Sequence, residues 1–407
     1  MIVDVELTAE TYGPDCIARL PDGRTLFVPF GVVGETVKVE IVEEKKNYAR
    51  GKIVKVLQPA AARIDPRCPH FGDCGGCHYQ HLPYAAQLAL KQRIVTQQLQ
   101  RIGKIEAPPV MEIVPSPLEW NYRNAVQFHL SAEGKAGYER MGSNRVVQVS
   151  ECHLPLVAIN SLWPRVEIDA ESGIGRFSVR AGAGDDLLLA FEGATAPEFE
   201  IDFPLSVVFL GEEGSTLLSG EDYTLHSILG RDFHVTAGAF FQVNTAVAEK
   251  MVAHVLKALG DRRYRHIVDA YCGVGLFSAF LAPRCDQLTG IELSEAACND
   301  FVTNLDEFDH VALYMGKVEQ VLPALEIRPD LILLDPPRAG LDVRALEGLL
   351  KAQPQQVIYV SCDPATLARD LRKLLDDGYI LQSVTPFDMF PQTYHVETIS
   401  LLTKETH

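Results

Sequence analysis

Cys362 is the residue whose surroundings in the sequence most favour covalent chemistry. An apolar, β-rich run that starts at Val357 ends at this cysteine, and Asp363-Pro364 follow directly. Because Asp is a common N-cap and Pro fits the first helical position, we expect a helix to begin here. The positive end of a helix dipole favours an anion, which predicts a shift of the thiol toward thiolate. The pattern indicates a nucleophile, and its alternative is a small side chain buried at a strand end.

A second set of thiols lies in the N-terminal half. Cys68, Cys74 and Cys77 have the spacing C-x5-C-x2-C, and two glycines free the backbone between the last two. This spacing is typical of a metal site, and Cys152 is the best candidate for a fourth ligand, because Cys16 lies among predicted short strands. Zinc and a [4Fe-4S] cluster both fit the spacing, and unligated core cysteines are the remaining alternative.

A glycine turn in the C-terminal half suits a nucleoside ligand. The strand 266–270 runs into Tyr271-Cys-Gly-Val-Gly, and Glu292 follows Gly273 at the distance where an acid binds ribose hydroxyls. The third glycine of a dinucleotide fingerprint is missing, which disfavours NAD and favours a ligand such as S-adenosylmethionine. Asp335, in an Asp-Pro-Pro loop at a later strand end, is expected beside the same crevice; its alternative is a purely structural turn.

From about residue 236 onward, the sequence predicts an α/β domain that positions these residues. Strands alternate with helices, which predicts a doubly wound, Rossmann-like parallel sheet with functional loops at the carboxyl ends of its strands. The expected strands are 266–270, 287–291, 330–334, 356–360, 380–386 and 397–402, and the expected helices are 245–259, one from Leu276, 294–305 and one from Asp363.

The N-terminal half reads as mostly β. Short strands and turns over residues 6–58 predict a small OB-like barrel, and apolar spacing predicts an amphipathic helix over 82–102. Strands at 125–130, 135–140 and 145–149, continued by short strands over 160–235, predict one antiparallel domain. We therefore expect three domains: a barrel (1–60), a central β domain with the cysteines (61–235), and an α/β domain (236–407) against which the 82–102 helix packs.

Charge is distributed unevenly along the chain. The net charge is −17, but the segment 165–222 alone holds thirteen acids and three arginines. Any RNA footprint is therefore expected on the N-terminal half and away from the acidic segment. Within the barrel, cations and one aromatic residue form a strip that suits a phosphate-tracking groove or, equally, a solvated hairpin face: Lys45, Lys46, Tyr48, Arg50, Lys52 and Lys55.

The first residues and the cysteine count bear on the compartment. The chain starts with acids where a signal peptide needs basic and apolar residues, and no apolar stretch has membrane-spanning length. Nine cysteines are an odd number, which disfavours a disulfide framework. We expect a soluble, cytoplasmic protein without membrane partners.

The motifs taken together resemble the RNA 5-methyluridine methyltransferases over nearly the whole chain. The resemblance rests on Phe241-Gln-Val-Asn, Asp269-x2-Cys-Gly-x-Gly, Gly290-Ile-Glu, Asp335-Pro-Pro-Arg-x-Gly, Ser361-Cys-Asp-Pro-x-Thr-Leu-Ala-Arg-Asp and His395-Val-Glu. Residues 13–51 similarly resemble the RNA-binding TRAM domain. The barrel and cysteine cluster are most similar to members that modify 23S ribosomal RNA and carry a [4Fe-4S] cluster, so the resemblance favours iron–sulfur over zinc. A transfer-RNA substrate stays open, and we expect a monomer.

The resemblance also implies roles for single residues. Cys362 would be the nucleophile and Glu397 the base, and Gln242, Tyr271, Glu292 and Asp335 would contact S-adenosylmethionine. The thiolate would add to C6 of a flipped uridine, against which Phe240 or Phe241 would pack, and C5 would then take the methyl group. Two positions depart from the family pattern: Leu276 stands where some members have a polar cofactor contact, and Gly316-Lys317 replaces the acid or amide often found near the adenine. The alternative for Glu397 is a surface carboxylate, and a different class of function is a non-catalytic RNA-binding or ribosome-assembly factor.

Overall fold

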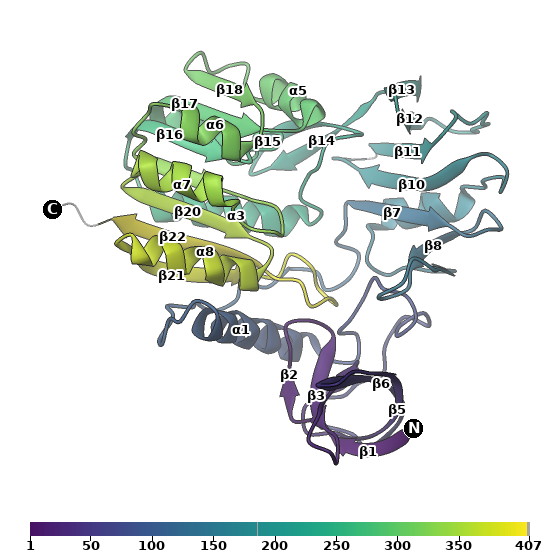
Figure 1. The fold of residues 1–407 in the computed structure, drawn as a ribbon. Coiled ribbons are helices and arrows are strands. Elements are labelled where there is room, and N and C mark those ends of the chain that lie inside the picture. The colour runs from purple at the N-terminus through teal and green to yellow at the C-terminus, as the bar shows by residue number, and fades with distance from the viewer. Residues whose placement is uncertain (185, 405–407) are drawn as a thin grey trace.

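The C-terminal half is built on a seven-stranded sheet with the order β18-β17-β16-β19-β20-β22-β21 (Figure 1). Its inner pairs are parallel, and β22 runs antiparallel between β20 and β21. This arrangement confirms the predicted doubly wound, Rossmann-like sheet. The strands are β16 (Tyr264–Ala270), β17 (Cys285–Glu292), β18 (Val311–Met315), β19 (Leu331–Leu334), β20 (Gln356–Ser361), β21 (Tyr379–Phe387) and β22 (Glu397–Lys404). The computed structural model describes residues 1–184 and 186–404.

Helices cover both faces of this sheet. Successive residues of a strand point to opposite faces; accordingly, Ile267 packs with α3 (Thr245–Leu259) and α5 (Glu295–Asn304), whereas Val268 packs with α6 (Val318–Ala324), α7 (Val343–Ala352) and α8 (Pro364–Asp376). The sequence analysis did not identify β18, α6 or α7. The helix expected from Leu276 is only the short α4 (Ser278–Leu281), followed by the 3₁₀ turn η2 (Ala282–Arg284), because Pro283 removes a helical N–H donor.

The first strands close into a small barrel with the order β1-β5-β6-β4-β3-β2. Its interior is apolar and fully buried, as at Leu7, Ala18 and Leu26. Gly51 is required in β6, since a Cβ there would lie 2.2 Å from Cγ1 of Val39. The strands are β1 (Ile2–Glu6), β2 (Ala9–Glu10), β3 (Asp15–Arg19), β4 (Thr25–Pro29), β5 (Thr36–Glu44) and β6 (Tyr48–Gln58).

Helix α1 (Tyr84–Arg101) lies between the barrel and the C-terminal sheet (Figure 1). Its residues Val95 and Leu99 share a core with α8 and β21. On the same helix, the fully buried ammonium of Lys91 donates to Asp388 Oδ1 at 2.5 Å and to the Phe390 carbonyl at 2.9 Å. The helix therefore holds the chain segment that leads into β22.

The central sheet has the order β13-β12-β11-β10-β7-β8-β9, and it differs from prediction in one pair: β11 and β12 run parallel. The strands are β7 (Ala125–Leu130), β8 (Ala136–Glu139), β9 (Val146–Gln148), β10 (Ile174–Ala181), β11 (Leu187–Gly193), β12 (Ser206–Gly211) and β13 (Gly214–Ser219), with α2 (Val157–Leu162) and the 3₁₀ turn η1 (Trp163–Arg165) on one face. A parallel pair needs a crossover connection, which short predicted strands do not reveal.

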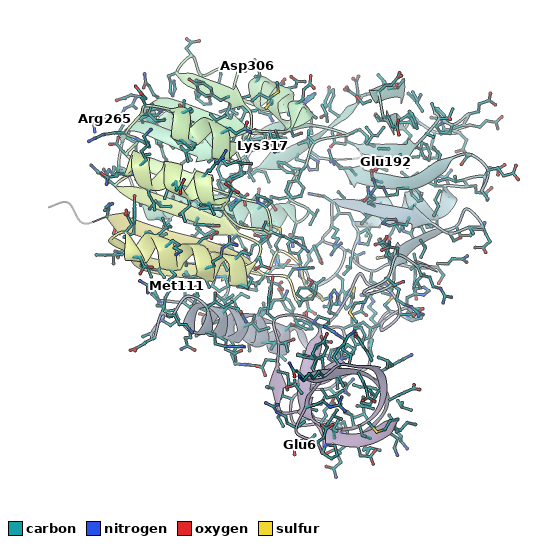
Figure 2. All side chains as sticks on the ribbon, viewed as in Figure 1. Glu6, Met111, Glu192, Arg265, Asp306 and Lys317 are labelled. Atoms are coloured by element: carbon teal, nitrogen blue, oxygen red, sulfur yellow. The ribbon has the colours of Figure 1, made fainter. Side chains whose placement is uncertain are left out.

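The hairpin β14 (Tyr223–Ile228) and β15 (Arg231–Thr236) forms a separate two-stranded sheet. Its buried Ile228, Phe233 and Val235 share the core of α3 and the C-terminal sheet. The side chains of Glu6, Arg265 and Asp306 point outward from the barrel and the C-terminal sheet (Figure 2). Among the described residues, none of the helices has both the length and the apolarity that crossing a membrane requires.

Candidate active site and RNA-binding surfaces

Cys362 and Glu397 lie opposite one another at the carboxyl end of β20. In the antiparallel ladder of β20 and β22, Ser361 pairs with Thr398, so the next residues outward are Cys362 and Glu397. The Thr398 hydroxyl donates to the Ser361 carbonyl at 3.1 Å and holds this register. Glu397 is 5% exposed and Cys362 is half-buried. The ladder therefore brings a thiol and a carboxyl to one end of the same strand pair.

Burial controls the protonation of both groups. It raises the pKa of Glu397 to about 8, with Asp335 adding to the effect, and it raises the pKa of Cys362 to about 12, with Glu397 adding to the effect. Asp363 caps α8 as predicted, by accepting from the N–H groups of Ala365 and Thr366. The predicted shift toward thiolate is nevertheless wrong for the protein without RNA. Desolvation and the nearby carboxyl outweigh the helix terminus.

Arg338 is a member of this site to which the sequence analysis gave no role. Its guanidinium lies 3.4 Å from the ring nitrogens of His395, and its positive charge lowers the pKa of both Cys362 and Glu397, against the effect of burial. The signal was present in the sequence, since Arg338 closes the Asp-Pro-Pro-Arg motif. This cation is the nearby group that favours the ionised forms of thiol and carboxyl.

The barrel also reaches the loop that holds Cys362. Tyr12 contacts the backbone of Cys362, and its ring meets Tyr394 edge-on at 5.8 Å. His78, next to Cys77, lies with its ring 4.7 Å from that of Tyr394. No local pattern could have revealed these contacts, because the partners lie some 300 residues apart in the chain.

A second group of predicted residues lies at the carboxyl ends of β16, β17 and β19. Tyr271 donates its N–H to Ile291 at 2.9 Å, and Gly273 donates its N–H to Glu292 Oε2 at 2.9 Å. Glu292 Oε1 also accepts from the N–H groups of Leu293 and Ser294, both at 2.7 Å. The backbone of the glycine turn therefore fixes the Glu292 carboxylate at the topological switch point, where doubly wound sheets bind ligands.

Asp335 lies at the same edge, directly after β19. Its N–H donates to the Ala270 carbonyl at 3.2 Å, so it lies beside Tyr271. Burial, with the nearby Glu292 carboxylate adding to the effect, raises the pKa of Asp335 to about 7. Tyr271 and Gly273 both have positive φ, at 65° and 53°, and a Cβ on Gly273 would meet nothing within 4 Å. The turn leaves open space that suits a bound nucleoside.

Gln242 lies in the turn before α3. Its carbonyl accepts from Asn124 Nδ2 at 3.0 Å, and the neighbouring Asn244 donates to the Met389 carbonyl at 3.3 Å. Of the two aromatic residues proposed to meet the base, Phe240 is 71% exposed, whereas Phe241 is buried against His226. Of the two, Phe240 is open to solvent and Phe241 belongs to the core.

The four predicted metal-ligating cysteines line one cavity of about 60 Å³: Cys68, Cys74, Cys77 and Cys152. Gly75 N–H donates to the Glu139 carbonyl at 2.9 Å and joins the cysteine loop to β8. Among residues 1–184 and 186–404, no three His, Cys, Asp or Glu side chains are grouped closely enough to hold a metal ion. The cysteines converge as the spacing predicts, and the metal itself stays a prediction.

The basic strip of the barrel divides into paired and unpaired cations. Arg50 makes an ion pair with Asp15 at 3.1 Å and lies over the Phe27 ring, and Lys45 pairs with Glu43. Among the described residues, three exposed cations of this strip make no ion pair: Lys46, Lys52 and Lys55. The strip therefore keeps three cations that are available to phosphates.

Comparisons with known proteins agree with this geometry. A family model described as tRNA (Uracil-5-)-methyltransferase matches residues 215–319 and 322–405, and the TRAM domain model matches residues 2–54. An uncharacterized RNA methyltransferase of Streptomyces avermitilis is 35% identical over 98% of this chain and 97% of its own length. One of Thermosynechococcus vestitus is 32% identical, with 98% of each chain covered.

A solved structure shares the fold over its whole length. It is the Pyrococcus abyssi tRNA (uracil-54, C5)-methyltransferase in complex with S-adenosyl-L-homocysteine, with a TM-score of 0.76, 23% identity, and 98% of this chain and 99% of that chain covered. This chain belongs to the TRAM-containing family of RNA uracil-5-methyltransferases, which use S-adenosylmethionine as methyl donor.

Proposed function

We propose that this methyltransferase modifies one uridine of 23S ribosomal RNA and that it works through a covalent bond between Cys362 and C6 of the base. The observation that carries the proposal is the position of Cys362 opposite Glu397 at the end of β20 and β22. Glu292 and Asp335 lie at the same carboxyl edge of the sheet, so methyl donor and base meet there. In this proposal residues 1–60 and 61–235 deliver the RNA and residues 236–407 carry out the reaction.

The first step needs a thiolate because C5 of uracil is a poor nucleophile. Cys362 loses its proton to solvent and its sulfur bonds to C6, so the electron pair of the C5–C6 double bond moves toward C5 and O4 as an enolate. C5 then attacks the methyl group that S-adenosylmethionine supplies, and the sulfonium becomes a neutral thioether. The cation of Arg338 supports this step, since it favours ionisation of the thiol against the effect of burial.

The second step removes the C5 proton. Glu397 accepts it, the electron pair of the C5–H bond forms the C5–C6 double bond, and the bond from C6 to sulfur breaks. Glu397 lies opposite Cys362, a position that supports this order of reaction steps. A buried carboxyl with a pKa of about 8 is a stronger base than an exposed one, so it suits abstraction from carbon.

The methyl donor is proposed to lie against the glycine turn. The open space at Gly273 admits its amino acid or ribose part, and the fixed carboxylate of Glu292 suits the ribose hydroxyls. Tyr271, Asp335 and Gln242 complete the proposed contacts. Glu292 and Asp335 make the crevice acidic, and an acidic crevice supports binding of a cationic methyl donor.

A covalent trap tests the reaction. RNA that contains 5-fluorouridine has no C5 proton to release, so it should form a stable adduct with the wild-type protein, visible as a retarded band on a denaturing gel. Cys362→Ala should form no adduct and lose all methyl transfer. Cys285→Ala, which removes a buried thiol at the start of β17, is the matched control and should behave as wild type. An intact adduct in Cys362→Ala would refute the mechanism, and no adduct in the wild type would favour a non-catalytic RNA-binding factor.

The choice of 23S ribosomal RNA rests on the combination of barrel and cysteine cavity. Transfer RNA is the second candidate, because the solved structure that matches over the whole length acts on uracil 54 of tRNA. Incubation with 23S transcripts and with total tRNA, followed by nucleotide-resolution mapping of 5-methyluridine, separates the two. We expect one site in 23S RNA and no transfer to tRNA.

We also propose a [4Fe-4S] cluster in the four-cysteine cavity. The cavity is several times larger than the space that one water needs. Cys68, Cys74, Cys77 and Cys152 all line it, and four cysteine thiolates are the donor set that such a cluster takes. An absorbance spectrum of anaerobically purified protein tests this: iron–sulfur protein is coloured and zinc protein is not. The expected monomeric state and cytoplasmic location stay predictions.

A further inference from the structure

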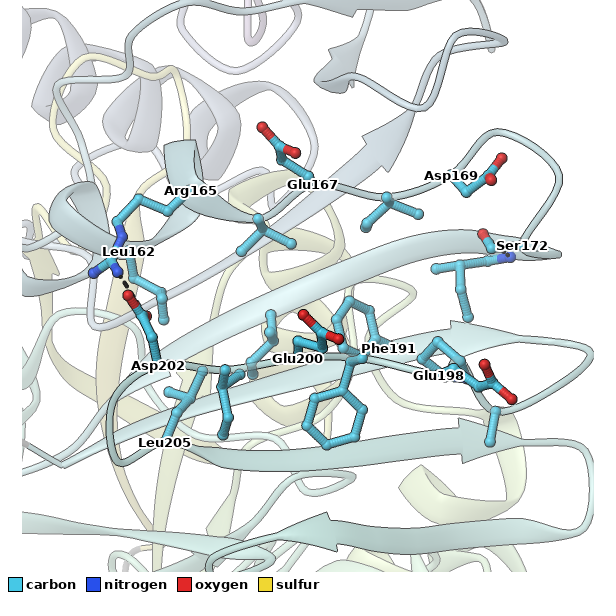
Figure 3. Close-up of a pocket in the computed structure, with 18 of the residues that line it drawn as sticks. Leu162, Arg165, Glu167, Asp169, Ser172, Phe191, Glu198, Glu200, Asp202 and Leu205 are labelled. Atoms are coloured by element: carbon cyan, nitrogen blue, oxygen red, sulfur yellow. Dashed lines mark hydrogen bonds and ion pairs between the residues drawn. The ribbon is translucent and has the colours of Figure 1, made fainter.

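A cavity of about 410 Å³ lies in the central sheet and shares no residue with the active site. Its floor consists of apolar side chains of α2, β10 and β11, among them the buried Leu162, Ile174 and Phe191. Figure 3 shows Glu167 and Asp169 along one side of the opening and Glu198, Glu200 and Asp202 along the other. The cavity is therefore apolar inside and acidic at its rim.

The cavity follows from the parallel pairing of β11 and β12. A parallel connection usually carries a helix that covers the sheet. Here residues 194–205 make the connection without a helix or strand, and this segment crosses the sheet as a strap. A strap fills less space over the sheet than a helix does, so a cavity remains next to the apolar side chains beneath it.

The strap has the sequence pattern of a strand that lacks a neighbour. Acids at 198, 200 and 202 alternate with Phe199, Ile201 and Phe203, which is the period of a half-buried strand. Phe199 and Ile201 are 36% and 39% exposed. In the described part of the chain, no backbone hydrogen bond is made by residues 195–203. The strap thus offers unpaired backbone groups and exposed apolar side chains to an added strand.

The negative charge at the rim of the cavity favours a basic partner. Glu167, Glu198 and Glu200 are exposed and make no ion pair or hydrogen bond through their side chains among residues 1–184 and 186–404. Arg165, the one cation that lines the cavity, pairs with Asp202 at 3.0 Å and lies over the Phe203 ring. Such a rim repels phosphates and attracts lysine and arginine.

We propose that this cavity binds an extended, basic segment of a partner protein in which lysine or arginine alternates with apolar residues. The segment adds as a strand along the strap, places its apolar side chains over the cavity floor, and pairs its cations with the acids of the rim. The acidic segment is then a protein-docking surface on an RNA-modifying enzyme, on a different part of the molecule from its basic barrel. The proposal does not depend on the reaction, the RNA or the cysteine cavity.

A fluorescein-labelled peptide in which lysine and valine alternate tests the proposal by fluorescence anisotropy on the full-length protein. We expect the triple variant Glu167→Gln, Glu198→Gln, Glu200→Gln to weaken binding at least fivefold. The matched control Glu212→Gln, Glu213→Gln, Glu221→Gln changes the net charge equally on the same domain but outside the cavity, and it should bind as wild type. Phe199→Ser should weaken binding at least fivefold, whereas Leu217→Ser, at an exposed position outside the cavity, should not.

Three results would overturn the proposal. The first is equal affinity of the wild type and the triple variant for the lysine–valine peptide. The second is equal weakening in both triple variants, which would reduce the effect to net charge. The third is that a labelled oligouridine binds the wild type and loses affinity in the cavity variants, which would assign the surface to RNA. Circular dichroism of each variant checks that the fold is retained.

Discussion

The hydroxyl of Tyr12, in the loop between β2 and β3, donates a 3.5 Å hydrogen bond to the backbone carbonyl of Cys362. This contact joins the barrel to the loop that holds Cys362, across 350 positions of the sequence. Nearby, the Tyr79 hydroxyl donates to the Gly13 carbonyl at 3.2 Å, and Arg93 pairs with Glu10 at 2.9 Å. Residues 10–13 of the barrel therefore contact both α1 and the loop that holds Cys362, and they also bond to Tyr79.

This contact predicts that the barrel helps to position the nucleophile. Tyr12→Phe removes the hydroxyl and keeps the ring against Tyr394, so we expect kcat with RNA to fall about threefold to tenfold, the worth of one hydrogen bond. Affinity for S-adenosylmethionine, measured by calorimetry, should not change. Tyr379→Phe, which removes a hydroxyl that donates to the Pro354 carbonyl at the opposite end of the β21–β22 ladder from Glu397, is the control. Unchanged kcat in Tyr12→Phe would show that the contact is only structural.

The protonation of Glu397 predicts a pH dependence. Its pKa of about 8 means that below this pH the carboxyl is protonated and does not accept the C5 proton. Cys362, with a pKa of about 12, is also a neutral thiol there. Both effects have the same sign, so single-turnover methyl transfer should rise as the pH increases from 6 to 9. A flat profile over this range would contradict the assignment of Glu397 as base.

Arg338 should set the position of that profile. Its cation lowers the pKa of Cys362 and Glu397, so Arg338→Gln should raise both pKa values, move the pH profile upward, and slow the reaction at pH 7 about tenfold. Arg344→Gln removes an exposed arginine from the neighbouring α7 and is the matched control. A slower Arg338→Gln enzyme whose profile keeps its midpoint would assign the residue to RNA binding instead.

Much of the site was predictable because its signals are local. A strand followed by Asp363-Pro364 predicts where α8 begins, and the glycine turn with Glu292 predicts the ligand crevice, since these patterns depend on hydrogen bonds between near neighbours. Cys68, Cys74 and Cys77 were predictable as a group from their close spacing, whereas Cys152 was inferred because the other cysteine of the N-terminal half lies in the barrel. The C-terminal sheet positions the Cys362 loop and the glycine turn within the molecule. Its alternation of strands and helices was predictable from the spacing of apolar residues.

The rest depends on tertiary contacts that a sequence does not display. The pKa of Cys362 was predicted to fall because a helix terminus is visible in the sequence, whereas the burial that raises it is not. The parallel pairing of β11 and β12 is likewise a choice of partner strand, which alternation alone does not specify. Tyr12 carries no motif, so only the folded chain reveals its contact with Cys362.

Glu397→Gln should separate the two steps of the reaction. The amide retains the size of the side chain but does not accept the C5 proton, so the adduct with Cys362 forms and does not resolve. We expect turnover to fall at least about a hundredfold and a covalent complex with unmodified RNA to accumulate on denaturing gels. Glu347→Gln, an exposed position on α7, should turn over as wild type. Rapid release of RNA by Glu397→Gln would place the base elsewhere.

Finally, Gly75 and Gly76 offer a matched pair for the cysteine cavity. A Cβ at Gly75 would lie 2.6 Å from the Glu139 carbonyl and 3.1 Å from the Met141 nitrogen, whereas a Cβ at Gly76 would meet only Cys74 Sγ at an ordinary 3.5 Å. Because both close contacts of Gly75 are backbone, Gly75→Ala must displace the loop from β8 and with it Cys74. We therefore expect Gly75→Ala to lose most of its iron and acid-labile sulfide, and Gly76→Ala to keep them. Equal metal contents in the two variants would mean that the cavity is not the cluster site.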